Sequence, residues 1–196
     1  VTPGYWRQPA MTAQAFDEEG YYCMGDAGRL ADAERPERGI VFDGRIAEDF
    51  KLQSGTWVHV GALRVALIGA LAPLVSDAVI TGQDRTEVGA LVFPNVAASR
   101  TLCPDLPQDA ALADVLTHPS VRDAVNGGLS KLASQDSGSS GRIARVLLME
   151  EPPSIDANEI TDKGYVNQRA VLTRRSALVE ALHAGETGHA IVSLAT

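Results

Sequence analysis

Residues 39–60 read Gly-Ile-Val-Phe-Asp-Gly-Arg-Ile-Ala-Glu-Asp-Phe-Lys-Leu-Gln-Ser-Gly-Thr-Trp-Val-His-Val, and this stretch decides the fold. The apolar run Ile40–Phe42 predicts a buried strand that ends in a turn at Asp43-Gly44. Ser54-Gly55 predicts a second turn, which leads into a strand over residues 56–60. Charged side chains gather between the two turns, and their spacing alone is typical of a solvated hairpin; they are Arg45, Glu48, Asp49 and Lys51.

Composition limits the function classes. The chain has 196 residues, 45% of them hydrophobic, which is enough for one medium domain or a small domain with an appendage. The net charge is −8 and there are only three lysines, which argues against binding nucleic acid. No apolar run is long enough to cross a membrane.

The cysteines and histidines indicate no metal site. Cys23 and Cys103 stand in unrelated contexts without metal-ligand spacing, so we expect free thiols in a reducing compartment, the cytoplasm. The four histidines are scattered, and none forms a recognisable triad with a cysteine or serine.

The apolar pattern predicts an α+β fold, a small central sheet with helices in two or three layers. Residues 1–43 predict short strands and turns. The expected elements beyond them are a helix at 62–75, strands at 77–82 and 88–93, helices at 109–116 and 119–133, a loop at 134–141, a strand at 143–149, an extended mobile stretch at 150–159, a helix at 165–184 and a short strand at 190–194. On the last helix, Arg174 and Arg175 fall off the apolar face.

Three segments together resemble a known superfamily. Gly44-Arg45-x-x-Glu48-Asp49-Phe50-Lys51-Leu52-x-Ser54-Gly55-Thr56-Trp57-Val58 is similar to the segment that joins the large and small domains of the adenylate-forming (ANL) acyl-CoA synthetases. The upstream pattern agrees, with Thr2-Pro3-Gly4-Tyr5-Trp6, Gly20-Tyr21-Tyr22 and Met24-Gly25-Asp26. Residues 159–169, Glu-Ile-Thr-Asp-Lys-Gly-Tyr-Val-Asn-Gln-Arg, resemble the C-terminal lysine segment. Within the superfamily the chain is most similar to feruloyl-CoA synthetases and long-chain fatty acid-CoA ligases.

The resemblance implies a division of the chain. Residues 1–44 would be the β-rich end of a large N-terminal domain, 45–51 the hinge, and 52–196 the mobile C-terminal domain. The chain opens on Val1 within a motif, so we expect a larger N-terminal part to precede it. No Ser/Thr/Gly-rich phosphate loop followed by lysine occurs in these residues, so we expect this portion alone to be inactive.

The implied reaction converts ATP, a carboxylic acid and CoA, with Mg²⁺, into acyl-CoA, AMP and pyrophosphate. A hydroxycinnamic or other aromatic acid, or a fatty acid, would be the substrate, and no tightly bound cofactor is expected on this portion. The oligomeric state is left open. One alternative is an adenylating domain that delivers acyl groups to a carrier protein or a reductase. Another is a non-catalytic α+β binding module.

The resemblance implies that two residues bind the nucleotide. The Asp26 carboxylate would accept hydrogen bonds from both ribose hydroxyls, and the Arg45 guanidinium would lie beside the ribose and phosphates. The alternatives are an aspartate that stabilises its own turn and an exposed ion pair of Arg45 with Glu48 or Asp49.

The same resemblance implies a hinge and a thioester-forming loop. The hinge is Glu48 when counted back from Gly55, or Ala47 when counted forward from the arginine. Gly55 and Trp57 would line the CoA tunnel in the second half-reaction. Turn geometry is the alternative for Gly55, and core packing is the alternative for Trp57.

Lys163 is the candidate catalytic residue. A mobile ammonium can bridge the attacking carboxylate and the α-phosphate of ATP, where negative charges meet in the transition state. Lys163 is the only lysine in the last third of the chain and precedes a predicted helix. The commoner family form has glycine before the lysine, whereas Gly164 follows it here. The alternative is a solvated loop lysine.

Overall fold

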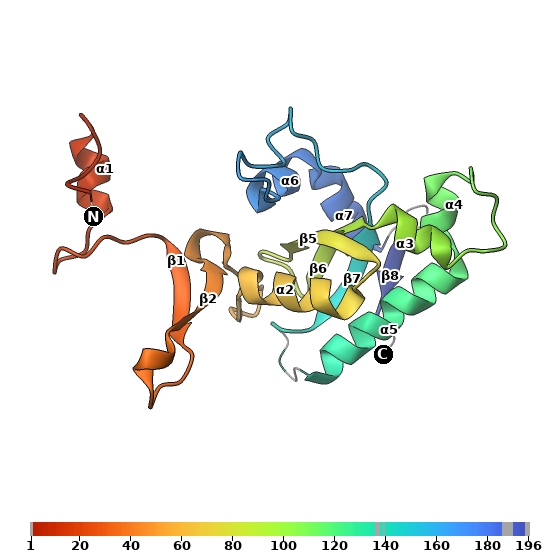
Figure 1. Cartoon of the computed structure of the whole chain (residues 1–196), viewed down its shortest axis with the longest axis horizontal. Coiled ribbons are helices and arrows are strands. Elements are labelled where there is room, and N and C mark those ends of the chain that lie inside the picture. The colour runs from red at the N-terminus through yellow and green to blue at the C-terminus, as the bar shows by residue number, and fades with distance from the viewer. Residues whose placement is uncertain (1, 136–137, 139, 186–189, 195–196) are drawn as a thin grey trace. The chain divides into compact units, whose positions relative to one another are not determined.

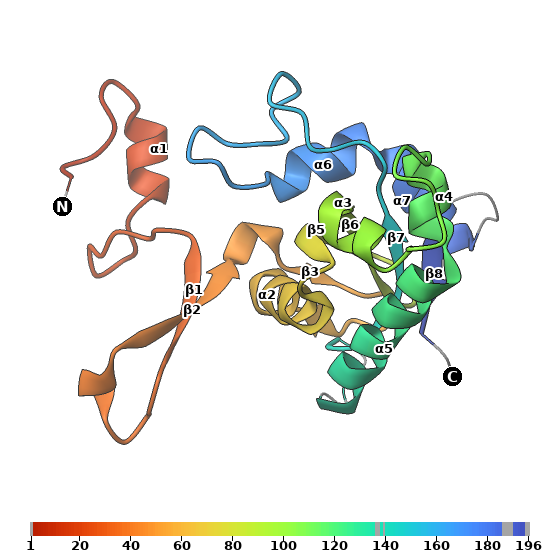
Figure 2. The same cartoon turned by 45° about the vertical axis from the view of Figure 1, so that its right-hand side comes forward.

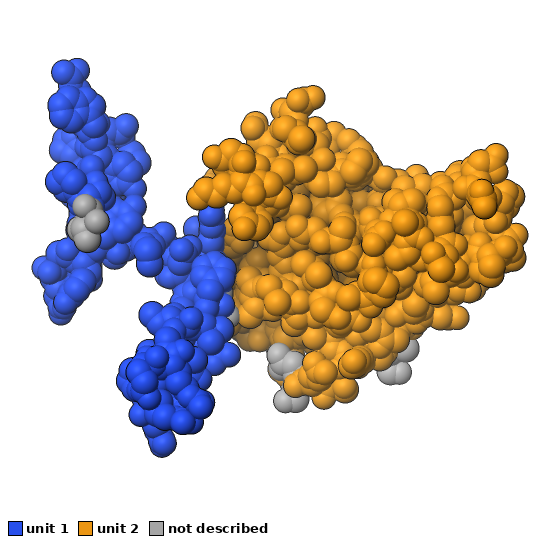
Figure 3. Space-filling model, viewed as in Figure 1, with its two compact units in different colours: residues 1–47 blue, residues 48–196 orange. Residues whose placement is uncertain are grey.

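The computed structural model describes residues 2–135, 138, 140–185 and 190–194. The chain forms two compact units, Val1–Ala47 and Glu48–Thr196, coloured separately in Figure 3. Each unit is described by itself. In the second unit, both the hydrophobic core and the regular sheet are well developed.

The first unit is an antiparallel ribbon with few buried residues. It contains α1 (Pro9–Gln14), β1 (Asp26–Leu30), η1 (Pro36–Arg38) and β2 (Ile40–Arg45), and β1 pairs with β2 (Figure 1). The expected strand at Ile40–Phe42 forms, but Ile40 is 74% exposed and Phe42 is 66% exposed, so the prediction of burial is wrong. The predicted turn at Asp43-Gly44 is also wrong, because β2 runs through it to Arg45.

The second unit is built on a four-stranded sheet. Its strands are β5 (Val75–Thr81), β6 (Val88–Pro94), β7 (Ile143–Leu148) and β8 (Ile191–Ser193), in the order β5-β6-β7-β8. The β5–β6 hairpin is antiparallel, β6 and β7 are parallel, and β7 and β8 are antiparallel. The short ribbon of β3 (Phe50–Lys51) and β4 (Trp57–Val58) precedes this sheet.

Helices cover both faces of the sheet (Figures 1 and 2). The helices are α2 (Val60–Leu71), α3 (Val96–Thr101), α4 (Leu112–Thr117), α5 (Pro119–Gln135), α6 (Gln168–Arg174) and α7 (Ser176–Ala184). Ile80 packs in one core cluster with leucines of α2 and α5, whereas its neighbour Val79 packs in the other with Leu182 of α7. This alternation is the two-residue period of a strand buried on both faces. The predicted α+β fold is confirmed, and of the two or three layers expected the structure has three.

Several element boundaries differ from the predictions. The helix expected at 62–75 ends at Leu71, before Pro73, and β5 begins at Val75. The strand expected at 56–60 is limited to Trp57–Val58, because α2 begins at Val60. The short helix α3 was not predicted; the Asn95 side chain caps it by accepting from Ala98 N at 3.2 Å.

The predicted last helix is two helices. Helix α6 ends at Arg174 and α7 begins at Ser176, with Arg175 at φ −102° and ψ 29° between them. The stretch expected to be extended at 150–159 instead contains a turn, in which Asn158 N donates to Ile155 O at 2.9 Å. Residues 136, 137 and 139 of the predicted loop lie outside the described residues, as do 186–189 and 195–196 of the tail. In the part of the chain that is described, no helix combines the length and apolarity needed to cross a membrane.

Candidate functional site

Asp26 and Arg45 lie opposite each other in the first unit. They are register partners at the end of the β1–β2 ribbon, and both are exposed. The ladder is extended beside them by Ile46 N, which donates to Gly25 O at 2.9 Å. Because directly opposite residues of an antiparallel pair share one face, a carboxylate and a guanidinium are presented together to solvent.

The two hinge candidates lie where the units meet along the chain. Ala47 is the last residue of the first unit and Glu48 the first of the second, and both belong to the single-turn helix η2 (Ile46–Glu48). The next charged residue, Asp49, accepts from Val60 N at 2.9 Å and contacts His59 Nδ1 at 3.0 Å, so it holds the start of α2. The hinge itself stays a prediction.

The loop between β3 and β4 turns at Gly55. Gly55 has φ 83°, where a side chain would be strained, and its N donates to Leu52 O at 2.8 Å. Trp57 is 52% exposed, so the alternative of core packing is wrong. The Lys51 ammonium lies 4.9 Å from the centroid of the Trp57 ring, which is cation–π distance. The ribbon therefore presents an aromatic face next to a positive charge.

Lys163 lies in a short hairpin, residues 160–166, which we call the lysine hairpin. Ile160 and Val166 form an isolated antiparallel bridge, and Thr161 N donates to Tyr165 O at 2.8 Å. Gly164 closes the turn with φ 82°, and its N donates to Thr161 O at 2.9 Å. Lys163 is exposed at this turn. A flexible cation is thus displayed at the tip of a defined backbone.

Glu159 stands at the base of the lysine hairpin. It is 0% exposed, and its carboxylate accepts from Arg175 Nε at 2.8 Å and from Arg175 Nη2 at 2.9 Å. Arg174 Nη1 donates to it at 3.0 Å. The hydrogen bonds from Arg175 outweigh the effect of burial and lower the pKa of Glu159 to about 2. The carboxylate is therefore ionised throughout the physiological pH range.

Arg175 is a residue that the sequence analysis placed wrongly. It is 5% exposed, donates to Glu151 O and Pro152 O at 2.8 Å each, and lies 5.2 Å from the Phe93 ring centroid. The predicted position off the apolar face is therefore wrong. No local sequence pattern indicates this role, because the apolar pattern continues through Arg175 and its partner Glu159 lies sixteen residues earlier.

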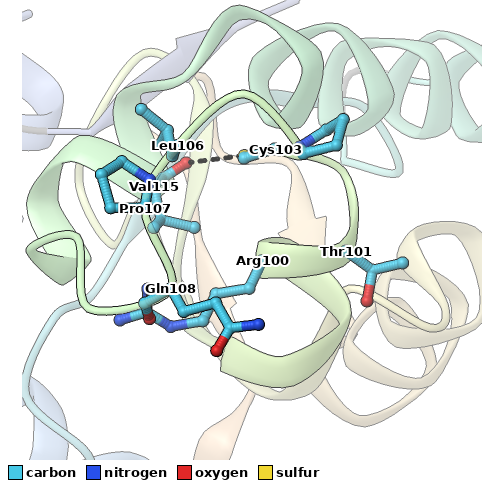
Figure 4. Close-up of a pocket in the computed structure, with 8 residues that line it drawn as sticks. Arg100, Thr101, Cys103, Leu106, Pro107, Gln108 and Val115 are labelled. Carbon is cyan, nitrogen blue, oxygen red and sulfur yellow. Dashed lines mark hydrogen bonds between the residues drawn. The ribbon is translucent and has the colours of Figure 1, made fainter.

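Two hollows among the described residues are lined by none of these side chains. One, of about 540 Å³, is formed by the segment between α3 and α4, where the Cys103 thiol faces Val115 O at 4.0 Å (Figure 4). Burial raises the pKa of Cys103. The other, of about 550 Å³, lies among α2, α3 and α5. Neither is lined by Lys163, Gly55 or Trp57. Among the described residues, no three histidine, cysteine, aspartate or glutamate side chains lie together so that they could hold a metal ion. We therefore assign no residue to Mg²⁺ binding.

Comparison with known proteins identifies the family. Residues 62–187 match the sequence model of the AMP-binding enzyme C-terminal domain. The probable acyl-activating enzyme 16, chloroplastic, of Arabidopsis thaliana is 26% identical over 93% of this chain and 26% of its own length. A long-chain-fatty-acid–(acyl-carrier-protein) ligase, chloroplastic, of the same plant is 23% identical over 93% of this chain and 24% of its own length.

A solved structure shares the fold. The A domain of carboxylic acid reductase from Segniliparus rugosus, in complex with AMP and a co-purified carboxylic acid, superposes with a TM-score of 0.72. It is 24% identical and covers 94% of this chain and 27% of that chain. The present chain thus spans about a quarter of the length of each of these relatives. Since the family model matches well over half of the residues, the chain belongs to the AMP-binding enzyme C-terminal domain family of the adenylate-forming (ANL) superfamily.

Proposed function

We propose that this chain is the C-terminal portion of an AMP-forming acyl-CoA synthetase. Its substrates are ATP, a carboxylic acid and CoA, and its products are acyl-CoA, AMP and pyrophosphate. The family supports the adenylate-forming chemistry. The resemblance to feruloyl-CoA synthetases favours a hydroxycinnamic or other aromatic acid, and a fatty acid is the alternative. Residues 1–44 would complete the large domain, 45–51 would form the hinge, and 52–196 would form the domain that moves.

The register of the first ribbon is the observation that supports this function best. Asp26 and Arg45 are 19 positions apart, and the resemblance assigns both to one nucleotide. As opposite residues of the β1–β2 ribbon they are close enough to contact one ribose together. The carboxylate would accept from the two ribose hydroxyls, while the guanidinium would donate to the phosphate side.

Lys163 supplies the charge for the first half-reaction in this proposal. A carboxylate oxygen attacks the α-phosphorus of ATP, the bond to pyrophosphate breaks, and pyrophosphate leaves with the electron pair. The Lys163 ammonium would contact both negative partners and stabilise the charge where it concentrates. Its exposed position at the tip of the lysine hairpin supports this role, because the group must enter a site built by other residues.

The second half-reaction would use the ribbon of β3 and β4. Rotation about Ala47 or Glu48 would exchange Lys163 for the Gly55 loop at the acyl-adenylate. The CoA thiolate then attacks the acyl carbon and AMP leaves. Gly55 would let the backbone approach the pantetheine, and the exposed Trp57 ring would pack along it.

Replacement of Lys163 tests the function. In the protein that joins this chain to its upstream region, we expect Lys163→Ala to lower acyl-AMP formation by roughly 10²–10³-fold, because one preorganised charge contact is lost. Pyrophosphate exchange into ATP measures that step. Lys131→Ala, at an exposed position of α5, is the matched control and is expected to have no effect. Equal activity of the Lys163→Ala and wild-type proteins would refute the role and favour a non-catalytic binding module. ATP turnover by the 196-residue chain alone would contradict its proposed dependence on the upstream part.

The relatives support a second candidate acceptor. One is named as a ligase that acts on the acyl-carrier protein, and another belongs to a carboxylic acid reductase. An adenylating domain that delivers its acyl group to a carrier protein or a reductase would use the same first half-reaction. Incubation of the preformed acyl-adenylate with CoA or with a phosphopantetheinylated carrier protein separates the two. Faster thioester formation with CoA supports the synthetase, and faster loading of the carrier supports the alternative.

The cytoplasm is the compartment that we propose. Cys23 is exposed and Cys103 is buried, and both are free thiols. Unpaired cysteines are ordinary in a reducing compartment. Fractionation of cells that express the whole protein would test this location.

A further inference from the structure

The lysine hairpin is fixed at both of its ends by side chains buried in the second unit. Glu159 precedes the hairpin and Gln168 follows it, with 0% and 3% of their surfaces exposed. Buried polar side chains are costly to place in a protein interior, and they persist where their hydrogen bonds are satisfied. We propose that Glu159 and Gln168 are positioning residues that hold Lys163 for adenylation, an inference that rests on the function proposed above.

Glu159 anchors the first end through side chain and backbone. Its carboxylate receives two hydrogen bonds from Arg175 and one from Arg174, and it also accepts from Ser154 N at 2.8 Å. Four donors thus converge on one carboxylate. Its backbone O accepts from Asn167 N at 2.8 Å, which joins the two ends of the hairpin. The start of the hairpin is therefore tied to the junction of α6 and α7.

Gln168 anchors the second end to the sheet. Its Nε2 donates to Ile80 O at 2.7 Å, and its Oε1 accepts from Ile80 N at 3.1 Å. Because β5 is the edge strand of the sheet, these two backbone groups of Ile80 would otherwise lack a partner strand. The glutamine amide thus takes the place of a neighbouring strand, and the first residue of α6 is held at the sheet edge.

These anchors set where the tip of the hairpin can be. Only eight residues separate the anchors at either end, and the Ile160–Val166 bridge shortens the free segment further. The backbone of Lys163 is consequently held, while its exposed side chain keeps its freedom. Displacement of a reacting group by about 1 Å can cost about a hundredfold in rate. Loss of either anchor should therefore act on the step that uses Lys163.

A purely structural network would behave differently. Damage to the second unit as a whole would slow adenylation and acyl transfer alike, because the Gly55 loop belongs to the same unit. A positioning role affects adenylation alone. The two half-reactions, measured separately in each variant, distinguish these possibilities.

The variants are Glu159→Gln and Gln168→Met, made in the protein that joins this chain to its upstream region. Glu159→Gln removes the charge that faces two arginines, and Gln168→Met keeps the size but removes both bonds to Ile80 without leaving a buried charge. The matched control is Asp77→Asn. It weakens another partly buried ion pair of the second unit, in which Arg64 Nη2 lies 2.6 Å and 2.7 Å from the two Asp77 oxygens.

We expect both variants to lower kcat for pyrophosphate exchange by roughly tenfold to a hundredfold, with acyl transfer from a supplied acyl-adenylate to CoA changed less than about threefold. The control is expected to change the ratio of the two rates by less than about threefold. Equal losses of rate in both half-reactions, or an unchanged rate of pyrophosphate exchange in both variants, would overturn the inference.

Amide hydrogen exchange of the 196-residue chain gives an independent readout. Residues 160–166 should exchange faster in Glu159→Gln and Gln168→Met than in the wild type or Asp77→Asn. Unchanged amide hydrogen exchange in residues 160–166 of both variants would show that Glu159 and Gln168 do not hold the hairpin. If the wild-type whole protein formed no acyl-AMP, the proposed function would fail and with it the catalytic part of this inference. Hydrogen exchange would still decide whether the two side chains hold the hairpin.

Discussion

His183 is a half-buried histidine whose ring resists protonation. Its Nε2 is buried without a hydrogen-bond partner among the described residues. Burial, together with the charges of Arg85 and Arg145, lowers its pKa to about 4, although Glu180 opposes this shift. In the unfolded chain a histidine titrates at about 6.5. Between these two pKa values the unfolded state binds a proton at His183 and the folded state does not. The contribution of His183 to stability is therefore complete above about pH 6.5 and is lost as the pH falls toward 4.

His183→Gln tests this pH dependence. Between about pH 7 and pH 5 the wild-type chain should lose about 1–2 kcal/mol more of its unfolding free energy than the variant does, because glutamine does not titrate. Urea unfolding of the 196-residue chain at both pH values measures the difference. Circular dichroism at neutral pH controls for the fold of the variant. Identical pH slopes would show that His183 is free to take up its proton in the folded state.

At the scale of single residues, the sequence predicted exposed groups better than buried ones. Lys163 and Gly55 lie in turns, as glycine-containing polar segments indicate. Glu159 and Arg175 escaped prediction, because charged residues are expected at the surface unless a partner is known. Their side chains are sixteen positions apart along the chain, and no local pattern encodes their pairing. The pairing of Asp26 with Arg45 likewise depends on strand register.

Helix α5 contains two adjacent glycines in different surroundings. A Cβ at Gly128 would lie 2.5 Å from Leu71 Cδ2 and 2.8 Å from Ala70 O, so α2 approaches α5 closely there. A Cβ at Gly127 would meet no atom within 4 Å. Glycine in a helix interior costs about 0.5–1 kcal/mol relative to alanine. We therefore expect Gly127→Ala to stabilise the second unit by about that amount, and Gly128→Ala to destabilise it by about 1–3 kcal/mol through overpacking.

Chemical denaturation of the two variants measures this contrast. Each substitution adds the same methyl group to the same helix, so each serves as the control for the other. Stabilisation by Gly128→Ala would mean that α2 moves away without cost. Destabilisation by Gly127→Ala would mean that its open surroundings in the folded chain are filled by a neighbouring group.

At the scale of elements, the period of the apolar residues predicted which helices and strands exist better than it predicted how long they are. The pattern over 165–184 continues through Arg175, yet the helix breaks there because the side chain is drawn to Glu159. Local propensity yields to tertiary contacts in such cases. Helix α2 stops before Pro73 for a local reason, since the residue before proline disfavours the helical conformation.

At the scale of the molecule, the order of elements was enough to predict a layered α+β unit. The parallel pairing of β6 with β7 was not predictable from spacing, because three helices lie between these strands. The first unit shows a further limit. Its apolar run Ile40–Phe42 predicted a buried strand, but burial depends on a surface to pack against, and Ile40 is 74% exposed.

The second unit should fold without the first. Both core clusters contain only residues from Phe50 onward, whereas in residues 1–47 only Gly44 is buried among those whose exposure is described. We expect a chain of residues 48–196 to unfold within about 2 °C of the 196-residue chain, because the deletion removes little buried apolar area. Calorimetry measures both midpoints, and limited trypsin digestion should cut at Arg29 or Arg38 before any site in the second unit. A midpoint lower by more than about 4 °C would show that the first unit stabilises the core by at least about 1 kcal/mol.

The deletion should also reduce binding of a hydrophobic dye, since it removes the exposed Trp6, Ile40 and Phe42.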